Sequence, residues 1–270
     1  MLPSAAERAI RHVTALSSGP PVDGMLRVTL NFHPDRAGIL DTLAADGVYL
    51  SQFATGTSNG GLTAHPAGDR WRWESRIFGG AYDDAPATER PVYGALNFRR
   101  HRFGAAPRFG SAHLRLSAGV LARTTFCYPD SNFEPTDFGV ASKFALTDLA
   151  NAAEVDSLDD YIEAQVHGPV RLARDVEALV LDPSYRDTPV EEAAGRLPCP
   201  VEWHGGFQLT VDELRRYPEY RGQRFVDLGV KLAVDGWLTP RVLGDAAALD
   251  RYDLQDLKRV WHYLARFGAR

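Results

Sequence analysis

Lysine, cysteine and long apolar runs are scarce in this chain of 270 residues. Lysine occurs only at positions 143, 231 and 258, and arginine supplies the other basic side chains, a bias typical of GC-rich bacterial genomes. The formal net charge of -5 lacks the basic balance that proteins binding a nucleic-acid backbone usually show. No apolar run approaches the roughly 18 residues of a membrane span, and the N-terminus lacks the apolar core of a signal peptide.

The two cysteines, Cys127 and Cys199, are far apart and have no metal-type spacing. A disulfide framework is therefore not expected, and a reducing compartment is favoured. Cys127 ends an apolar run, which indicates an inert core thiol rather than a nucleophile. The histidines lie in different segments without the spacing of a zinc protease, so we expect no metal site.

Hydrophobic residues make up 44% of the chain, enough for a sizeable core. Strand and helix patterns do not alternate regularly, which favours an α+β fold. Strands are predicted at 26–32, 92–98, 112–116, 124–128, 163–166 and 177–181. Helices are predicted at 4–16, 37–45, 69–78, 142–153, 190–196, 211–216, 225–233 and 253–267. These patterns divide the chain into an N-terminal helix and linker (1–24), a core (25–185) and a mostly helical extension packed on it (186–270).

A long, polar, glycine-rich loop at 51–61 is the first candidate for ligand binding. Small residues leave backbone amides accessible, and polar side chains add hydrogen-bonding groups suited to a nucleotide. The loop has neither the Walker lysine nor the dinucleotide glycine fingerprint. A structural Ω-loop is the alternative. The candidate binding residues are Ser51, Gln52, Thr55, Gly56, Ser58 and Asn59.

Four further positions are candidates for contact with a nucleotide. At the end of the first predicted strand, His33 is suited to a ribose hydroxyl and Arg36 to a diphosphate. The alternative is an ordinary helix-entry turn with Arg36 on the surface. Tyr93 is suited to stacking on a nicotinamide ring or to a place in the core, and Ser111 is a further polar contact.

Glu163 stands at the start of a predicted buried strand, where a carboxylate needs a partner or a chemical task. Gln165 follows two residues later, so both side chains point to one face of the strand. A carboxylate and an amide directed into one cleft fit sugar chemistry with an oxocarbenium-like transition state, because the carboxylate offsets the developing positive charge. A salt bridge or an exposed position is the alternative for Glu163.

The order of these parts resembles the ADP-ribosyltransferase superfamily. The segments NFHPDR, SQFATGTSNGGL, DRWRWESRIFGGAY, ERPVYGALN, RFGSAHLRL and EAQVHGPV resemble more specifically a bacterial family of domains of unknown function, from residue 28 to about 245. That family is similar to effectors, or toxins, that ADP-ribosylate ubiquitin on threonine. The resemblance implies a split β-sandwich with NAD, a substrate, bound in the cleft between its sheets.

The resemblance also implies roles for individual residues. Glu163 would bond the ribose 2′-hydroxyl and stabilise the oxocarbenium ion, Arg36 or His33 would fill the first-strand role, and Tyr93 would pack against nicotinamide. Pro34 replaces a glycine common among relatives, which leaves the choice between His33 and Arg36 open. We expect Arg36 to join Glu163 as a catalytic residue, and the other candidates, Gln165 included, to bind NAD.

The expected activity is transfer of a single ADP-ribose unit from NAD to a protein acceptor. Tyr161 stands two residues before Glu163, where arginine-specific relatives carry an acid or amide, so the resemblance disfavours arginine as the acceptor and leaves a hydroxyl, such as a threonine of ubiquitin, or a nucleic-acid base open. An NAD glycohydrolase, a nucleic-acid ADP-ribosyltransferase acting through the basic run at 99–102, and a non-catalytic nucleotide-binding module are the alternatives. The resemblance implies an enzyme made in a bacterial cytoplasm and delivered into a host cell.

Overall fold

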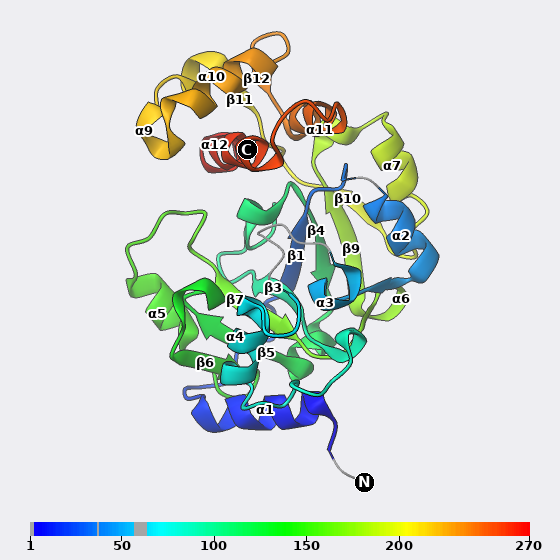
Figure 1. Cartoon of the computed structure of the whole chain (residues 1–270), viewed down its shortest axis with the longest axis vertical. Coiled ribbons are helices and arrows are strands. Elements are labelled where there is room, and N and C mark those ends of the chain that lie inside the picture. Colours follow the sequence, from blue (N-terminus) through cyan, green and yellow to red (C-terminus); the bar gives the residue numbers. More distant parts are fainter. Residues whose placement is uncertain (1–2, 37, 57–63) are drawn as a thin grey trace.

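The structure is a computed structural model that describes residues 3–36, 38–56 and 64–270, and it confirms an α+β fold (Figure 1). Eight described strands form one mixed sheet in the order β10-β9-β4-β1-β3-β7-β5-β6. Neighbouring strands are antiparallel except for the parallel pair β10 and β9. The strands are β1 (Val28–Phe32), β3 (Val92–Leu96), β4 (Ala112–Leu116), β5 (Thr124–Tyr128), β6 (Asp137–Val140), β7 (Ile162–Val166), β9 (Val176–Leu181) and β10 (Val201–Trp203).

The two faces of this sheet differ in chemistry because side chains alternate along each strand. One face is apolar and forms the main core, with Leu30, Leu114, Phe126, Ile162 and Leu179 among its buried residues. Polar residues cluster on the other face. Residues that are paired across neighbouring strands point to the same face, so the register shows which of them lie together. The register pairs Thr29 with Ala95, Asn31 with His113, Ala95 with Glu163, Thr125 with Gln165 and Cys127 with Glu163.

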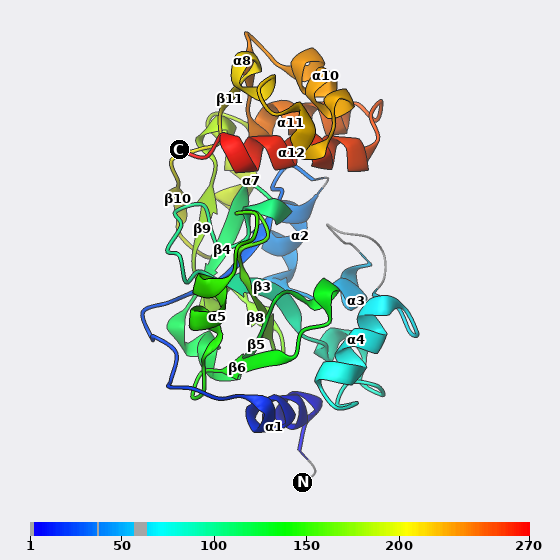
Figure 2. The same ribbon diagram turned by 90° about the vertical axis from the view of Figure 1, so that its left-hand side faces the viewer.

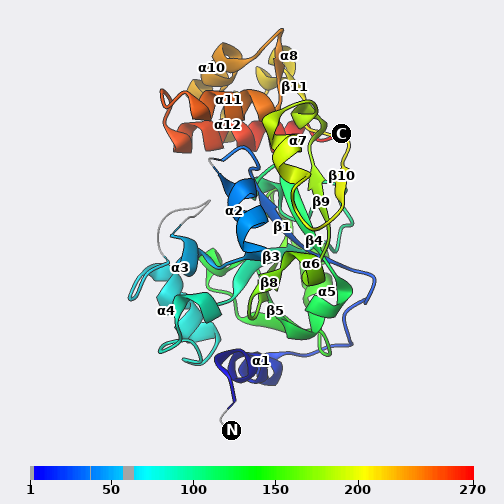
Figure 3. The ribbon, with the colours of Figure 1, turned by 90° about the vertical axis from the view of Figure 1, so that its right-hand side faces the viewer.

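Helices α2 (Ile39–Asp46), α5 (Leu146–Ala152) and α7 (Pro189–Ala194) contribute Leu40, Leu146 and Ala193 to the main core. Figure 3 shows α2 beside α7, and the ion pair between Arg196 and Asp41 joins their ends. The predicted helix at 37–45 begins at Ile39 in the structure, and residue 37 lies outside the described residues. These helices cover the apolar face of the sheet and shield it from solvent.

Helices α1 (Ala5–Leu16) and α4 (Asp69–Ile77) pack over β5 and β6 on the opposite face (Figure 2). The start of α1 is the predicted one, because Ser4 and Glu7 form a reciprocal capping box. Trp73 and Ile77 of α4 join Ala9 and Val13 of α1 in one apolar cluster. The polar face of the sheet is thus covered at this end.

The C-terminal helices form a lobe at the opposite end from α1, as the turned views show (Figures 2 and 3). The lobe has its own apolar cluster, which includes Phe207, Val226, Leu243, Val260 and Leu264. The elements are β11 (Leu209–Thr210), α8 (Val211–Leu214), α9 (Pro218–Arg221), α10 (Gln223–Leu232), β12 (Trp237–Leu238), α11 (Pro240–Ala248) and α12 (Leu254–Phe267). Most of these elements are helices.

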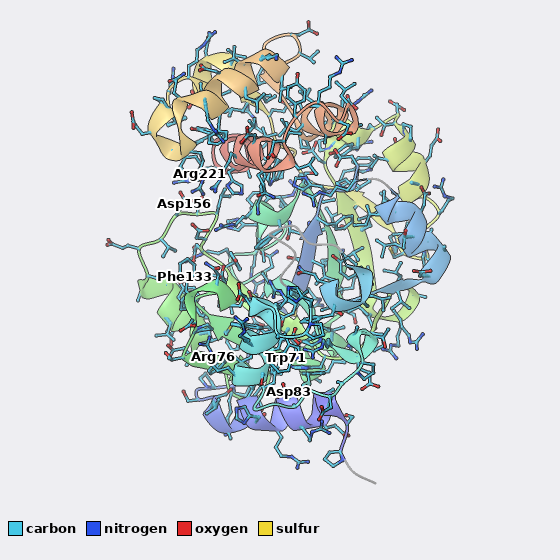
Figure 4. The ribbon with its side chains drawn as sticks, in the orientation of Figure 1. Trp71, Arg76, Asp83, Phe133, Asp156 and Arg221 are labelled. Carbon is cyan, nitrogen blue, oxygen red and sulfur yellow. The ribbon has the colours of Figure 1, made fainter. Side chains whose placement is uncertain are left out.

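Hydrogen bonds and an ion pair attach this lobe to connections beside the sheet. The indole nitrogen of Trp261 in α12 donates to the Pro107 carbonyl at 3.0 Å. The connection before β7 reaches the lobe through Asp156, which pairs with Arg266 at 3.2 Å and accepts from the Tyr220 hydroxyl at 3.3 Å. Arg221 of α9, labelled near Asp156 in Figure 4, also donates to the Tyr220 hydroxyl at 3.2 Å. The lobe is therefore packed against the part of the molecule that holds the end of β1.

Some elements differ from the sequence-based expectations. Strands β6 and β10 were not predicted, and β10 extends the sheet with residues that the sequence pattern assigned to the extension. The sheet therefore continues past residue 185. The predicted helix at 142–153 begins only at Leu146, because Val140 and Lys143 form a tight β-bridge before it. The remaining described elements are β2 (Val48–Tyr49), α3 (Gln52–Thr55), β8 (Val170–Arg171), α6 (Leu172–Asp175) and five short 3-10 helices at 87–89, 107–109, 118–123, 131–133 and 183–185.

Across the described ranges, no helix has both the length and the apolar character needed to cross a membrane.

Candidate functional site

Strands β1 and β3 diverge in the middle of the sheet and open a cleft. Only Val28 with Leu96 and Thr29 with Ala95 are paired between these strands, whereas β3 and β7 are paired along five positions. A cavity of about 450 Å³ lies at the divergence. Its walls come from the end of β1, α2, α3 and the start of β3. The polar and aromatic side chains that line it include His33, Arg36, Ser51, Gln52, Thr55 and Tyr93.

Glu163 lies on β7, one strand from Tyr93, and its side chain is 8% exposed. Its Oε2 accepts from the Ser131 hydroxyl at 2.9 Å and from the Ser131 amide at 3.3 Å. Its Oε1 accepts from Gln165 Nε2 at 3.1 Å. Burial raises the pKa of Glu163 above its usual range, and Arg70, Ser131 and Gln165 oppose that rise. The carboxylate is therefore held in place from both sides.

Arg70 of α4 interacts with both Tyr93 and Glu163. Its guanidinium stands over the Tyr93 ring at 4.3 Å and lowers the pKa of Glu163. Its Nε and Nη1 atoms are buried, and they have no hydrogen-bond partner within the part of the chain that the structure describes. A buried cation with unsatisfied donors next to a carboxylate is the kind of group that holds an anionic or carbonyl oxygen.

A buried ion pair between Glu74 and Arg90 holds Tyr93 through the Glu74 carboxylate. Glu74 of α4 is fully buried; it accepts from the Tyr93 hydroxyl at 2.7 Å and from Arg90 Nη1 at 2.6 Å. Burial raises the pKa of Glu74 to about 7, although Tyr93 and Arg90 lower it. The Arg90 Nη2 atom also donates to the Tyr82 carbonyl at 2.8 Å. The hydroxyl of Tyr93 is thus fixed, and so is the position of its ring in the cleft.

The end of β1 contacts the C-terminal lobe. The ring of His33 meets Trp261 of α12 edge-on, with centroids 5.1 Å apart. Burial, with the charges of Arg36 and Lys258, lowers the pKa of His33 to about 3, so its imidazole is neutral near pH 7. Arg36 lies nearer the surface, and burial lowers its pKa without removing its charge. A neutral imidazole and a guanidinium therefore share one wall of the cleft.

A second pocket of about 480 Å³ lies on the other side of Arg70, between α4 and the connection from β5 to β6. Ser131, which binds Glu163, lines this pocket together with Arg70 and Trp73. An ion pair of 3.0 Å between Arg76 and Glu134 joins its two walls. Figure 4 shows Arg76 and Phe133 on the same side of the molecule, and Phe133 is 59% exposed. Glu163 itself lines neither this pocket nor the cleft, and the pocket is connected to it through Ser131.

Comparison with known proteins identifies the family. A family described as "Protein of unknown function (DUF3626)" matches residues 27–150 and 144–267. The chain belongs to the DUF3626 family. No curated protein matches it. The family match spans both the sheet and the C-terminal lobe, so the lobe is part of the family's common architecture.

The structure brings some of the predicted site residues of this DUF3626 member together and separates others. The cleft brings together His33, Arg36, Ser51, Gln52, Thr55 and Tyr93. Gly56 follows α3 and is exposed. Ser58 and Asn59 lie outside the described residues. Ser111 is fully buried before β4 and lines neither pocket, since it packs beneath His204, whose Nε2 is 2.7 Å from its carbonyl oxygen.

Gln165 is buried behind Glu163 and lines neither pocket. It bonds Glu163 and Thr125, so its contacts are with the protein, where the sequence predicted contact with the nucleotide. Cys127 is also buried, and burial raises the pKa of its thiol well above the usual range. In the described portion of the chain, no cluster of three or more metal-binding side chains occurs.

Arg70, Glu74 and Ser131 were missed by the sequence reasoning. Arg70, Trp73, Glu74 and Ile77 follow the helical spacing of three and four residues, which places two charges on the buried face of α4. Two charges on the apolar side of a helix indicate a buried network or a site. That signal was present in the sequence. No local pattern pointed to Ser131, because its role depends on the pairing of β5 with β7.

Proposed function

We propose that the protein is an NAD-dependent protein mono-ADP-ribosyltransferase. The observation that supports this most strongly is the combination of a cleft between diverging central strands and a buried, oriented carboxylate one strand away. Glycosidic bond cleavage through an oxocarbenium-like ion needs a negative charge held in a site that excludes water. Glu163 is the carboxylate that meets this need.

We infer that the eight-stranded sheet is a split β-sandwich in the sense of the ADP-ribosyltransferase fold. The division would fall between β1 and β3, where only two residue pairs join the strands. One half would then be β10-β9-β4-β1 and the other β3-β7-β5-β6. NAD would lie across the gap, because ligands favour the point at which a sheet opens and leaves side chains from two strands free.

The polar groups in the cleft suit the parts of NAD. The neutral imidazole of His33 is suited to a ribose hydroxyl, and the guanidinium of Arg36 to the diphosphate. Tyr93 would pack against nicotinamide, with its hydroxyl fixed by Glu74. Ser51, Gln52 and Thr55 would contact the remaining polar edge of the nucleotide.

In the proposed reaction the C1′–N bond of NAD breaks and neutral nicotinamide leaves with the bonding electron pair. Glu163 offsets the positive charge on the sugar and accepts a hydrogen bond from the 2′-hydroxyl. An acceptor hydroxyl oxygen then bonds C1′ and releases its proton, which Glu163 takes up. The products are nicotinamide, the ADP-ribosylated acceptor and one proton, so atoms and charge balance.

We propose a protein acceptor that reaches Glu163 through the second pocket. The basic run at 99–102, which could favour nucleic acid, is largely neutralised because Arg99 pairs with Asp160 and Arg100 with Asp23, each at 2.8 Å. The overall charge of -5 also disfavours a polyanion. A threonine of ubiquitin is the first acceptor to test, because of the resemblance of the sequence to ubiquitin-modifying effectors.

The test is release of nicotinamide from NAD by wild type and by Glu163→Gln, which keeps the shape of the side chain. The matched control is Glu192→Gln, an exposed carboxylate of α7. We expect Glu163→Gln to lower kcat by at least about 100-fold, which corresponds to roughly 3 kcal/mol of lost transition-state stabilisation, while the control is unaffected. Turnover in Glu163→Gln equal to wild type, with both proteins folded, would refute the proposal.

A further inference from the structure

A continuous chain of buried polar side chains lies behind Glu163. Thr125, Gln165, His167 and Tyr82 are each no more than 2% exposed. Tyr82 Oη is 2.7 Å from His167 Nδ1, and His167 Nε2 is 2.9 Å from Thr125 Oγ1. Thr125 Oγ1 is 2.8 Å from Gln165 Oε1, and Gln165 Nε2 is 3.1 Å from Glu163 Oε1. None of the four lines either pocket.

The donors and acceptors of this chain can be assigned from the carboxylate outward. An ionised Glu163 only accepts, so it must face the Gln165 amide nitrogen, which also donates to Cys127 Sγ at 3.3 Å. The reversed amide would set its oxygen against the carboxylate. The Gln165 oxygen therefore faces Thr125 and takes the single hydroxyl proton of that residue.

The same assignment of donors and acceptors determines the tautomer of His167. Thr125 has given its proton to Gln165, so it must accept from His167, whose Nε2 carries the hydrogen. His167 Nδ1 is then an acceptor, and it receives the Tyr82 hydroxyl proton. Burial, with the charge of Arg123, lowers the pKa of His167 to about 3, which agrees with a neutral ring. Every donor in the chain points toward Glu163.

We propose that Tyr82, His167, Thr125 and Gln165 form a one-directional hydrogen-bond relay that positions the Glu163 carboxylate for catalysis. The relay holds Oε1 from within the protein, while Ser131 holds Oε2 at the second pocket. These are positioning residues, because they act on the Glu163 carboxylate through the Gln165 amide and line neither the cleft nor the second pocket. The catalytic consequence rests on the proposed function, whereas the direction of the relay and the His167 tautomer do not.

Thr125 is the link best suited to a kinetic test. Thr125→Val has nearly the same shape but cannot carry a hydrogen bond, and Thr125→Ser keeps the hydroxyl. We expect Thr125→Val to lower kcat for nicotinamide release by about 10–100-fold, since small displacements of a catalytic group have effects of this size. KM for NAD should change by less than about threefold, because the relay does not touch the cleft. Thr125→Ser should restore most of kcat.

The structural test is the nitrogen NMR spectrum of His167 in the full-length wild-type protein at neutral pH. We expect protonated Nε2 and unprotonated Nδ1, and loss of this pattern in Thr125→Val. A ring protonated on Nδ1 would overturn the relay, and so would wild-type kcat in folded Thr125→Val. Should wild type fail to cleave NAD, the proposed function fails while the His167 spectrum still decides the relay. Should Thr125→Val fail to fold, the wild-type spectrum still decides it.

Discussion

Replacing Arg90 with methionine breaks the ion pair that supports the site from behind. The two side chains of the pair are 5% exposed for Arg90 and fully buried for Glu74, and their closest atoms are 2.6 Å apart. Arg90 also donates to the Tyr82 carbonyl and stacks on Phe53 at 4.3 Å. Methionine fills much of the same space but leaves the Glu74 carboxylate without its cation.

Removal of one partner from a buried ion pair typically costs about 3–5 kcal/mol of stability. The cost should depend on pH, because burial raises the pKa of Glu74 from its ordinary 4.5 to about 7 even with Arg90 present. Between about pH 4.5 and pH 7, Glu74 is therefore protonated in the folded wild type but ionised in the unfolded chain, so the folded state binds more protons. The free energy of unfolding therefore falls by roughly 3 kcal/mol as pH rises through this window. Without Arg90 the pKa of Glu74 rises further, so the decline extends above pH 7.

The assay is urea unfolding followed by tryptophan fluorescence at pH 5 and pH 8. The matched control is Arg72→Met on α4, whose partner Asp69 is 80% exposed and whose loss should cost less than about 0.5 kcal/mol. We expect Arg90→Met to lose about 3–5 kcal/mol at pH 8 and clearly less at pH 5, where Glu74 is protonated. A loss equal to that of the control, or a loss independent of pH, would refute this reasoning.

Three further predictions concern the candidate site and its contact with the C-terminal lobe. The rate of nicotinamide release should fall on acidification with an apparent pKa above 4.5. The reason is that catalysis needs the ionised form of Glu163 and burial raises the pKa of this carboxyl. A midpoint at or below 4.5 in a pH–kcat profile would contradict this. Ser131→Ala removes a hydrogen bond to a charged group worth about 1.5–3 kcal/mol, so kcat should fall roughly 10–100-fold in a steady-state assay, and an unchanged kcat would count against the role of Ser131. Trp261→Ala should cost about 3–5 kcal/mol in urea unfolding and raise KM for NAD, because His33 loses its packing partner; unaltered stability would argue against packing of the lobe on His33.

The central strands were predictable because their signals are local. Runs at 92–98, 112–116 and 163–166 are short and apolar, and the structure has strands at Val92–Leu96, Ala112–Leu116 and Ile162–Val166. The N-terminal helix carried its capping box in the sequence. Strand β10 has only three residues, and it exists because β9 offers an edge to pair with, which a local pattern does not reveal.

The candidate site was predictable only in part, because much of it depends on register. Glu163 stood out as a charge within an apolar run. Thr125 is the hydrogen-bond partner of Gln165, and this contact can be recognised only once β5 and β7 are paired. The same pairing brings Ser131 to the Glu163 carboxylate. Arg70 and Glu74 share the helical spacing of Trp73 and Ile77, a signal that the sequence analysis did not use, and α4 packs with that side inward. The hydrogen-bond partners of the candidate site therefore depend on contacts between strands and between α4 and the sheet, which local sequence patterns do not reveal.

The most direct measurement of the central claim is the intact mass of ubiquitin after incubation with NAD and the purified protein, with nicotinamide followed in the same reaction. We predict nicotinamide release and a mass gain of one ADP-ribose unit on the acceptor, both lost in Glu163→Gln and both kept in Glu192→Gln. Nicotinamide release without any mass gain, on ubiquitin or on proteins of a cell lysate, would indicate a glycohydrolase. No consumption of NAD by the folded wild-type protein, with or without acceptors, would contradict the account.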